Sequence, residues 1–222
     1  SEWTTVSVAA EKVTPVSVAP SLVRNVSSVP YAGAALIRWA PPVSSGGAAV
    51  SYSVEYSVVG SDVWVEASGC EALSVMACRV LGFSEWGSAH IVRVQASNVS
   101  GASASVSSPE FIPYTVSDSG AFAEQVSVQP GNAQLDISWS GVDWSSYDRG
   151  APAKWVHVRA INPDSGASRQ CYIRVPAEDG ICSIVGLKNG DAHRVEIRLY
   201  NLALWSEWTT VSVAAEKVTP VS

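Results

Sequence analysis

Charged side chains are scarce in this sequence: it has 14 basic and 20 acidic residues among 222, and a formal net charge of −6. No basic cluster is visible, and binding to phosphate backbones requires one, so nucleic acid is not an expected partner. No apolar run reaches the eighteen residues of a membrane span, and none follows a basic opening segment, so we expect neither a span nor a signal peptide in this segment. Since 47% of the residues are hydrophobic, the chain has enough apolar surface for about two soluble domains.

Signatures of catalysis are also missing. There is no glycine-rich phosphate loop and no Gly-x-Ser-x-Gly turn, and no recognisable nucleophile accompanies the three histidines, His90, His157 and His193. Asp143 and Asp148 lie in a loop, where carboxylates are usually solvated rather than paired for acid and base work. We therefore predict a protein that is not an enzyme and holds no cofactor or metal.

That same loop, Gly141–Asp148, carries the aromatic residues Trp144 and Tyr147. We expect both rings to be exposed. An exposed aromatic ring could contact a glycan or an adjacent strand, so this loop is the expected contact loop.

A seventeen-residue segment occurs twice without a change. Ser1–Ser17 and Ser206–Ser222 both read SEWTTVSVAAEKVTPVS, at an offset of 205 residues. Identity over this length predicts that the sequence is a window on a tandem array with a 205-residue period.

Each period divides into two similar halves. Trp39 and Trp139 lie one domain length apart, and Ala89–Asn98 matches Ala192–Asn201 in pattern. Apolar residues alternate with polar ones, and Gly, Pro, Asn and Asp interrupt the runs, while helical spacing is nowhere sustained. These patterns predict an all-β sandwich in each half.

The two halves resemble fibronectin type III domains over nearly the whole chain. In the second half, Leu187–His193 is similar to the turn that carries the family's corner tyrosine, and the strand Arg194–Tyr200 and Asn201 follow it. His90 and His193 take the position of that tyrosine, and we expect their rings to bond the backbone. The resemblance implies strand G of a preceding repeat at 1–12, a linker at 13–20, domains at 21–114 and 115–217, and the start of the next linker at 218–222.

Leu204–Thr209, LWSEWT, resembles the WSXWS motif of class I cytokine receptors, with Thr209 in place of the last serine. In that family the motif serves folding and secretion, and its tryptophans stack with arginines of the neighbouring strands. Glu196 stands where a further arginine would extend such a stack. The resemblance implies a ladder of Trp155, Arg159, Arg194, Arg198, Trp205 and Trp208.

The position of this motif places Ser206–Glu216 as strand G of domain two. Its copy at Ser1–Glu11 then belongs to a preceding domain, because domain one has its own strand G within Ala102–Phe111. A continuous polypeptide or strand donation between subunits could supply that arrangement, and the continuous array is favoured. The expected inter-repeat strand residues are Trp3, Val6, Val8, Trp208, Val211 and Val213. Linkers with proline and no glycine predict a stiff fibre with a repeat of roughly 70–80 Å.

Four cysteines allow three disulfide pairings. The local pairing, Cys70 with Cys78 and Cys171 with Cys182, keeps each bridge inside one domain and is favoured. No Cys-x-x-Cys pair accompanies these residues, which argues against zinc. Disulfides predict an oxidising, extracellular setting, either secreted or in a cell-surface appendage.

Sites for covalent glycans are expected too. Asn25 and Asn98 begin N-glycosylation sequons, and Asn98 is favoured because the turn after its strand should be exposed. Trp205 begins a Trp-x-x-Trp pattern that resembles C-mannosylation sites.

Three classes of function fit these patterns. The exact repeat favours a structural subunit of an extracellular filament, whose partners are copies of itself along the filament axis. A receptor-like or adhesive ligand-binding ectodomain is the alternative, and an accessory module of a carbohydrate-active enzyme is the second alternative.

Overall fold

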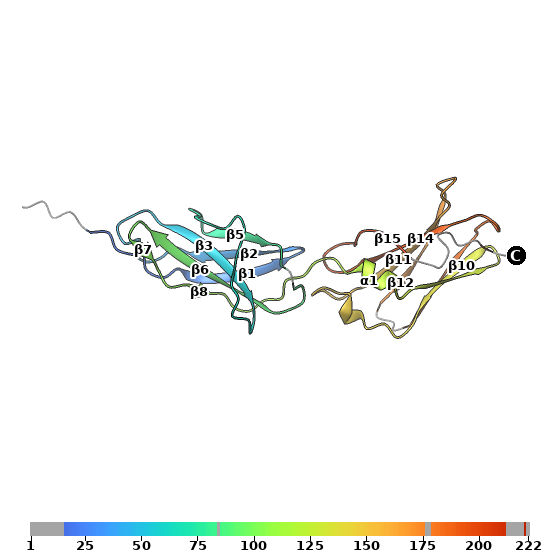
Figure 1. The fold of residues 1–222 in the computed structure, drawn as a ribbon, viewed down its shortest axis with the longest axis horizontal. Helices are drawn as coiled ribbons and strands as arrows, with labels where there is room; N and C mark the ends of the chain where they lie inside the picture. Colours follow the sequence, from blue (N-terminus) through green and yellow to red (C-terminus); the bar gives the residue numbers. More distant parts are fainter. Residues whose placement is uncertain (1–15, 84, 176–178, 212–219, 221–222) are drawn as a thin grey trace, which may run out of the picture.

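The computed structural model describes residues 16–83, 85–175, 179–211 and 220. They form two β-rich units that follow each other along the long axis of the molecule. Strand β7 (Gly101–Ala102) of the first unit and strand β10 (Gln134–Trp139) of the second lie toward opposite extremes (Figure 1). Of the expected inter-repeat residues, Trp3, Val6, Val8 and Val213 lie outside the described residues.

Domain one is a sandwich of two antiparallel sheets. The smaller sheet has the order β1-β2-β5, formed by β1 (Arg24–Tyr31), β2 (Ala34–Ala40) and β5 (Ala77–Leu81). The larger sheet has the order β4-β3-β6-β7, and β8 also pairs with β6. Its strands are β3 (Ser51–Val58), β4 (Val65–Glu66), β6 (His90–Asn98), β7 (Gly101–Ala102) and β8 (Val106–Ser107).

Domain two repeats this plan. The sheet β13-β10-β9 comprises β9 (Ser127–Gly131), β10 (Gln134–Trp139) and β13 (Gly180–Val185). The opposing sheet β12-β11-β14-β15 comprises β11 (Trp155–Ile161), β12 (Ser168–Arg174), β14 (Arg194–Tyr200) and β15 (Thr209–Thr210). In β14, alternate residues Val195, Ile197 and Leu199 face the interior and are at most 2% exposed, as a two-residue period requires.

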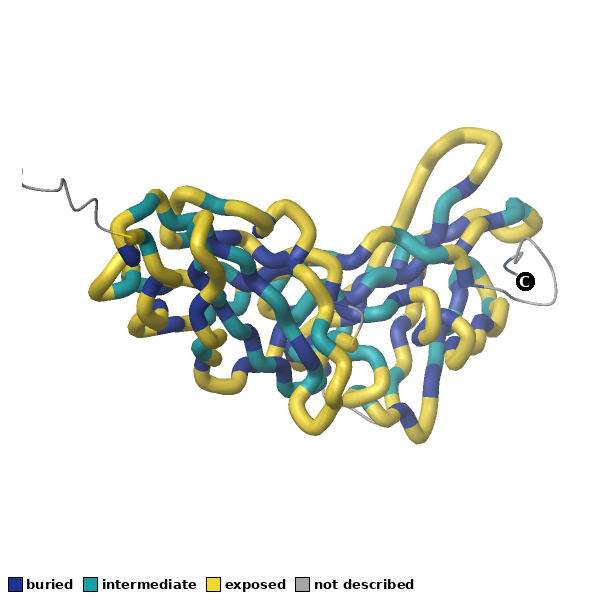
Figure 2. The backbone as a smooth tube through the Cα atoms, turned by 60° about the vertical axis from the view of Figure 1, so that its left-hand side comes forward, coloured by how far each residue is buried: buried dark blue, intermediate teal, exposed yellow. Residues whose placement is uncertain are grey.

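Each domain has its own hydrophobic core. One core extends from Val23 to Phe111 and the other from Phe122 to Val211. Trp39 and Trp139 are buried at equivalent places in them, with 6% and 4% exposure. Buried segments accordingly run inside each half of the molecule, while exposed segments form the loops (Figure 2).

Domain two contains a short helix that the alternating pattern does not reveal. Helix α1 (Ser119–Ala123) begins after Asp118, whose side chain accepts a hydrogen bond from the Ala121 amide at 3.1 Å. The helix places Phe122 in the core with no exposed surface. A 3₁₀ turn, η1 (Trp144–Ser146), lies in the Gly141–Asp148 loop.

Residues 206–211 complete the larger sheet of domain two. The Ser206 amide donates to the Leu199 carbonyl at 2.8 Å, and the Val211 amide donates to the Val195 carbonyl at 2.9 Å. Between them, β15 pairs with β14. The described part of the expected strand G thus lies antiparallel to β14, and Trp208 and Val211 belong to it.

Candidate functional site

The outer face of β11 and β14 carries a stack of alternating rings and guanidinium groups. The Arg159 guanidinium lies 3.9 Å from the centroid of the Trp208 ring, and Arg198 lies 4.4 Å from Trp208 and 4.5 Å from Trp205. Arg198 is therefore held between both tryptophans of the LWSEWT segment. Each such contact stabilises an exposed site by about 0.5–1 kcal/mol.

Two residues predicted for this ladder lie outside it. Arg194 instead makes an ion pair with Glu196, Nε to Oε1 at 2.8 Å. Trp155 pairs across the sheet with Tyr200 and Arg174, and within the described parts of the chain no guanidinium stacks on its ring. The ladder therefore consists of Arg159, Trp208, Arg198 and Trp205.

Glu196 lies at one end of the stack, where its carboxylate balances the positive charges of Arg159 and Arg194. Its carboxylate accepts a hydrogen bond from Arg159 Nε at 2.7 Å, in addition to its contact with Arg194. The residue is only 7% exposed, and a carboxylate at this depth is stabilised by opposite charges on both sides. Where a third stacked arginine would extend the ladder, the chain thus has a glutamate that bridges Arg159 and Arg194.

His157 and Tyr172 belong to the same cluster and were not anticipated. The imidazole stacks on Tyr172 with a centroid distance of 3.9 Å and meets the Trp208 ring edge-on at 4.7 Å. Arg198 Nε donates to His157 Nδ1 at 3.1 Å, and His157 Nε2 lies 3.0 Å from the Gln170 side-chain oxygen. Because Nδ1 accepts, Nε2 carries the proton and the ring is neutral.

The surroundings of His157 favour that neutral form. Burial lowers the pKa of His157 below its ordinary value of 6.5, the bond to Gln170 acts in the opposite direction, and the nearby Arg198 and Arg159 charges lower it further. The sequence contained one usable signal: His157 has the same strand parity as Trp155 and Arg159.

Domain one carries a much smaller version of this cluster. Arg93 on β6 lies 4.1 Å from the centroid of Trp64, and its Nε donates to Glu55 at 2.6 Å. One guanidinium and one ring thus occupy the face that holds four ladder side chains in domain two.

The other two histidines serve the fold. His90 Nδ1 donates to the Ser88 carbonyl and His193 Nδ1 to the Asp191 carbonyl, both at 2.9 Å. These are the backbone bonds expected where the corner tyrosine is replaced.

The Gly141–Asp148 loop does not present its aromatic rings as expected. Trp144 lies 4.9 Å and Tyr147 5.6 Å from Phe122, between ring centroids, and both rings pack against the core of domain two. The expectation of two exposed rings was wrong, because Phe122 on the unforeseen helix α1 offers them an apolar partner. Asp143 is exposed and caps the turn by accepting from Ser145, which lowers the pKa of this carboxyl.

The cysteines are paired locally. Cys70 bonds to Cys78 and Cys171 bonds to Cys182. The second bridge joins β12 to β13 and so crosses between the two sheets of domain two.

The two sequon asparagines have opposite environments. Asn98 Nδ2 donates to the Val18 carbonyl at 2.7 Å and to the Ser45 carbonyl at 2.8 Å, so both of its hydrogens are engaged. Asn25 is exposed in a bulge of β1, with φ of 53°, and within the described residues its side chain has no hydrogen-bond partner. The preference for Asn98 is reversed, because its amide nitrogen is already bonded to two carbonyls. Glycosylation at either site stays a prediction.

The linker between the domains is held at three consecutive carbonyls. Gly87 N donates to Pro113 O at 3.1 Å, Gly33 N donates to Tyr114 O at 2.9 Å, and Asn201 Nδ2 donates to Thr115 O at 2.7 Å. The first two donors belong to domain one and the third belongs to domain two. Both domains therefore hold the same short segment.

The domains also touch directly beside this linker. A Cβ atom built on Gly150 would lie 2.5 Å from Pro113 O and 3.0 Å from Gly87 N. Both glycines have φ near +86°, which other residues rarely adopt. A cavity of about 520 Å³ lies between the domains, with Trp86 on one side and Arg149 on the other.

In the described ranges, no group of His, Cys, Asp and Glu could hold a metal ion. The helices of those ranges also include none that is long and apolar enough to cross a membrane.

No protein-family model and no curated protein matches the sequence. Among solved structures, a chicken contactin 1 fragment with fibronectin domains FN1–FN3 is 15% identical with a TM-score of 0.46; the match covers 86% of this chain and 64% of that one. The chicken interferon gamma receptor alpha chain is 13% identical with a TM-score of 0.40, over 90% of this chain and 98% of that one. The chain thus spans 64% of the length of the contactin structure.

The strand orders, the paired sheets and the two cores define a tandem of fibronectin type III-like β-sandwiches. The second domain, with its LWSEWT segment and stacked arginines, resembles the WSXWS-bearing domain of class I cytokine receptors.

Proposed function

We propose that the chain is part of a receptor-like or adhesive extracellular ectodomain, in which the β-sandwiches form a stiff rod. The two disulfides support an oxidising compartment. The observation that carries the proposal is the linker between the domains, which is bonded from both sides.

A flexible linker exposes its backbone to water, whereas here Pro113, Tyr114 and Thr115 each use their carbonyl in a bond to a domain. The close contact between Gly87 and Gly150 leaves no space for a side chain at the joint. Such a joint keeps two domains at a constant angle and distance, which suits a spacer that positions a binding surface away from a cell.

A repeating extracellular filament is the second candidate function. The observation that favours it is the identity of Ser1–Ser17 with Ser206–Ser222, because a fibre needs equivalent units and a single receptor does not.

Small-angle X-ray scattering tests the rod. We expect one extended conformation whose largest dimension is insensitive to salt. Gly150→Asn should broaden the distribution of shapes, because its side chain collides with Pro113 and Gly87. Gly60→Asn is the matched control, since Gly60 has φ of +87° and open space around it. Equal scattering from both variants would contradict the stiff joint.

Antibody labelling tests the location. An antibody against the folded chain should stain intact cells of the source organism, or their surrounding material. Staining only after permeabilisation would contradict an ectodomain.

A further inference from the structure

Both domains receive their incoming segment through the same set of hydrogen bonds. In domain two, Thr115 N donates to Arg149 O at 3.1 Å, Asn201 Nδ2 donates to Thr115 O at 2.7 Å, and Asp118 N donates to Tyr147 O at 2.8 Å. In domain one the corresponding bonds are Val18 N to Gly46 O at 2.9 Å, Asn98 Nδ2 to Val18 O at 2.7 Å, and Ser21 N to Ser44 O at 3.0 Å. We call the part of each domain that binds the incoming segment its entry end, and the part that binds the outgoing segment its exit end. The entry end of domain one is therefore built like the entry end of domain two.

The outgoing segments are bound alike as well. Gly87 N donates to Pro113 O, and Gly190 N donates to Pro220 O, both at 3.1 Å. Each glycine lies three residues before the histidine that replaces the corner tyrosine. The exit end of domain two is thus built like the exit end of domain one, which is the end that contacts domain two.

We propose that the exit end of domain two docks on the entry end of domain one in a second copy of this chain, and that this contact repeats the joint found between the two domains. The inference rests on the filament candidate above, and it names the partner and the surfaces. Pro220 and Pro15 are the same residue of the seventeen-residue repeat, so the segment that leaves one copy is the segment that enters the next.

Chain length requires the two ends to be close. Between Pro113 and Thr115, each bound to one domain, there is one residue. Between Pro220 and the next copy's equivalent of Val18, there are two, Val16 and Ser17 of the repeat. Three residue steps span at most about 11 Å, against about 7 Å for two, because each step covers at most 3.6 Å. The joint between copies is therefore longer than the internal joint by one residue step only.

The surfaces of the two ends suit such a contact. Three valines at the entry end of domain one are left in water, with Val16, Val43 and Val99 exposed by 87%, 80% and 90%. Exposed apolar groups gathered at one place commonly mark an interaction site.

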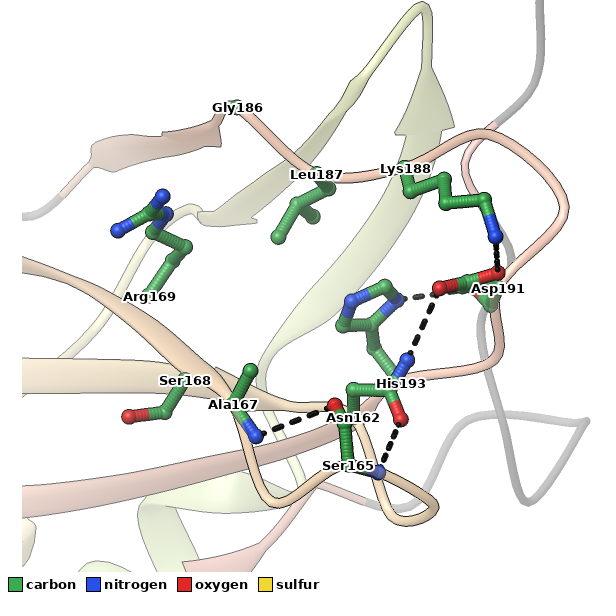
Figure 3. A pocket seen from close by; sticks show the side chains of 10 residues that line it. All are labelled: Asn162, Ser165, Ala167, Ser168, Arg169, Gly186, Leu187, Lys188, Asp191 and His193. Atoms are coloured by element: carbon green, nitrogen blue, oxygen red, sulfur yellow. Dashed lines mark hydrogen bonds and ion pairs between the residues drawn. The ribbon is translucent and has the colours of Figure 1, made fainter.

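The exit end of domain two offers a hollow of about 240 Å³, lined on one side by the ion pair of Lys188 and Asp191 and on the other by the guanidinium of Arg169 (Figure 3). Asp191 accepts from Asn162 at 3.1 Å and pairs with Lys188 at 3.3 Å. An apolar edge can therefore cover the Lys188–Asp191 side of the hollow without leaving either of these two ions unpaired.

Cross-linking of a polypeptide that carries two copies in series, sharing the seventeen-residue segment, tests the proposal. Lys188→Cys in the first copy and Val43→Cys in the second place thiols on the two ends, and a short bismaleimide joins them if the ends dock. The internal counterpart is Glu85→Cys with Ser146→Cys, at the equivalent positions of the existing joint. Ile181→Cys with Val43→Cys is the control pair, because Ile181 is 67% exposed on the side of domain two.

We expect the Lys188/Val43 pair to be bridged within about threefold of the internal pair and at least about tenfold more than the control pair, since docking raises the effective concentration of the two thiols. Gly47→Asn in the second copy should reduce the bridge to the control level, because Gly47 is the counterpart of Gly150 and an added side chain would enter the joint. Gly60→Asn should leave the bridge unchanged.

A bridge no stronger than that of the control pair, or one unaffected by Gly47→Asn, would overturn the proposed contact. The internal pair is read in the same sample, so loss of that bridge would instead count against the stiff rod of the proposed function.

Discussion

The two domains share how they bind their neighbours and differ in what covers their larger sheet. In domain one Asn98, the last residue of β6, binds the incoming segment, and in domain two Asn201, the residue after β14, does the same. In each domain a glycine amide, Gly87 N or Gly190 N, binds the carbonyl of the outgoing proline. On the sheet face, the described residues of domain one form a two-residue β4 and one Arg93–Trp64 contact, whereas those of domain two form a seven-residue β12 and the four-member ladder.

The two domains therefore show two separate roles of one fold: binding the neighbouring segments, and supporting a side-chain cluster on the larger sheet. The segment contacts recur because every domain in a row must fix an entry and an exit. The ladder is additional, since β12 brings Tyr172 and Gln170 beside His157 and so completes a cluster that the short β4 cannot form. Substitutions at equivalent places in the two domains therefore test whether the roles are separate.

The largest loss of stability is expected on substitution of Asn201 and Asn98, the asparagines that bind the incoming segments. Asn201 has no exposed surface: its two Nδ2 hydrogens are shared among the Thr115, Asp148 and Ala151 carbonyls, and its Oδ1 accepts from Ala203 N, whereas Asn98 donates to two carbonyls and is partly exposed. We expect Asn201→Ala to lower the free energy of unfolding of domain two by about 3 kcal/mol, and Asn98→Ala to lower that of domain one by about 2 kcal/mol, since each lost bond at a buried group costs about 1 kcal/mol. Urea denaturation of each variant measures both. A larger loss for Asn98→Ala would reverse the comparison.

The ladder arginine should give the next effect. Arg198 lies between two rings and bonds His157, whereas Arg93 lies over one ring and bonds Glu55. We expect Arg198→Ala to destabilise its domain by about 2 kcal/mol and Arg93→Ala by about 1 kcal/mol, from the number of cation–π contacts and hydrogen bonds lost.

Calorimetry of the two unfolding transitions measures this difference. Arg198→Lys is the control, because lysine keeps the charge but loses the planar group that fits between two rings. If Arg198→Lys matched the unsubstituted protein, charge rather than stacking would hold the cluster together.

We expect the free energy of unfolding of domain two to decrease at acidic pH, and we expect this decrease to depend on His157. Because the folded-state pKa of His157 is lowered from 6.5, the unfolded chain takes up this proton first as the pH falls. The stability that neutral His157 contributes is therefore complete above pH 6.5 and decreases as the pH falls from there through the folded-state pKa. Protonation would also remove the acceptor for Arg198 Nε.

Unfolding of domain two measured between neutral and mildly acidic pH checks this prediction, and His157→Gln should flatten the profile. The lowered pKa of Asp143 acts only near and below its ordinary value of 3.8 and so lies outside this window. An unchanged profile in His157→Gln would contradict the role given to this ring.

The smallest change in stability is expected from glycosylation, whose occupancy should differ between the two sequons. In a eukaryotic secretory host we expect a glycan on Asn25 and none on Asn98, whose amide hydrogens bond two carbonyls. Peptide mass spectrometry gives both occupancies and also tests mannose on Trp205. Full occupancy of Asn98 would show that modification precedes the binding of Val18.

Much of the fold could be predicted from the sequence because strands have a two-residue period. The alternation at Tyr52, Val54 and Tyr56, and at Val195, Ile197 and Leu199, assigned one face of each strand to the interior. The structure buries these residues except Tyr56, which is half-buried against the core. The site was harder to predict. Parity placed Arg159, Arg194 and Arg198 on one face, but it carries no information about which neighbours stack and which form ion pairs, and it left out His157.

The sequence by itself determined the strand faces, the division into two related halves and the 205-residue offset of the duplicated segment, since these depend on local alternation and on identity along the chain. Only the tertiary structure decided that Glu196 binds two arginines, that Asn98 holds the entering segment and that Trp144 and Tyr147 pack on Phe122. Those outcomes depend on which side chains meet across strands and loops distant in sequence, and a one-dimensional pattern does not contain those distances.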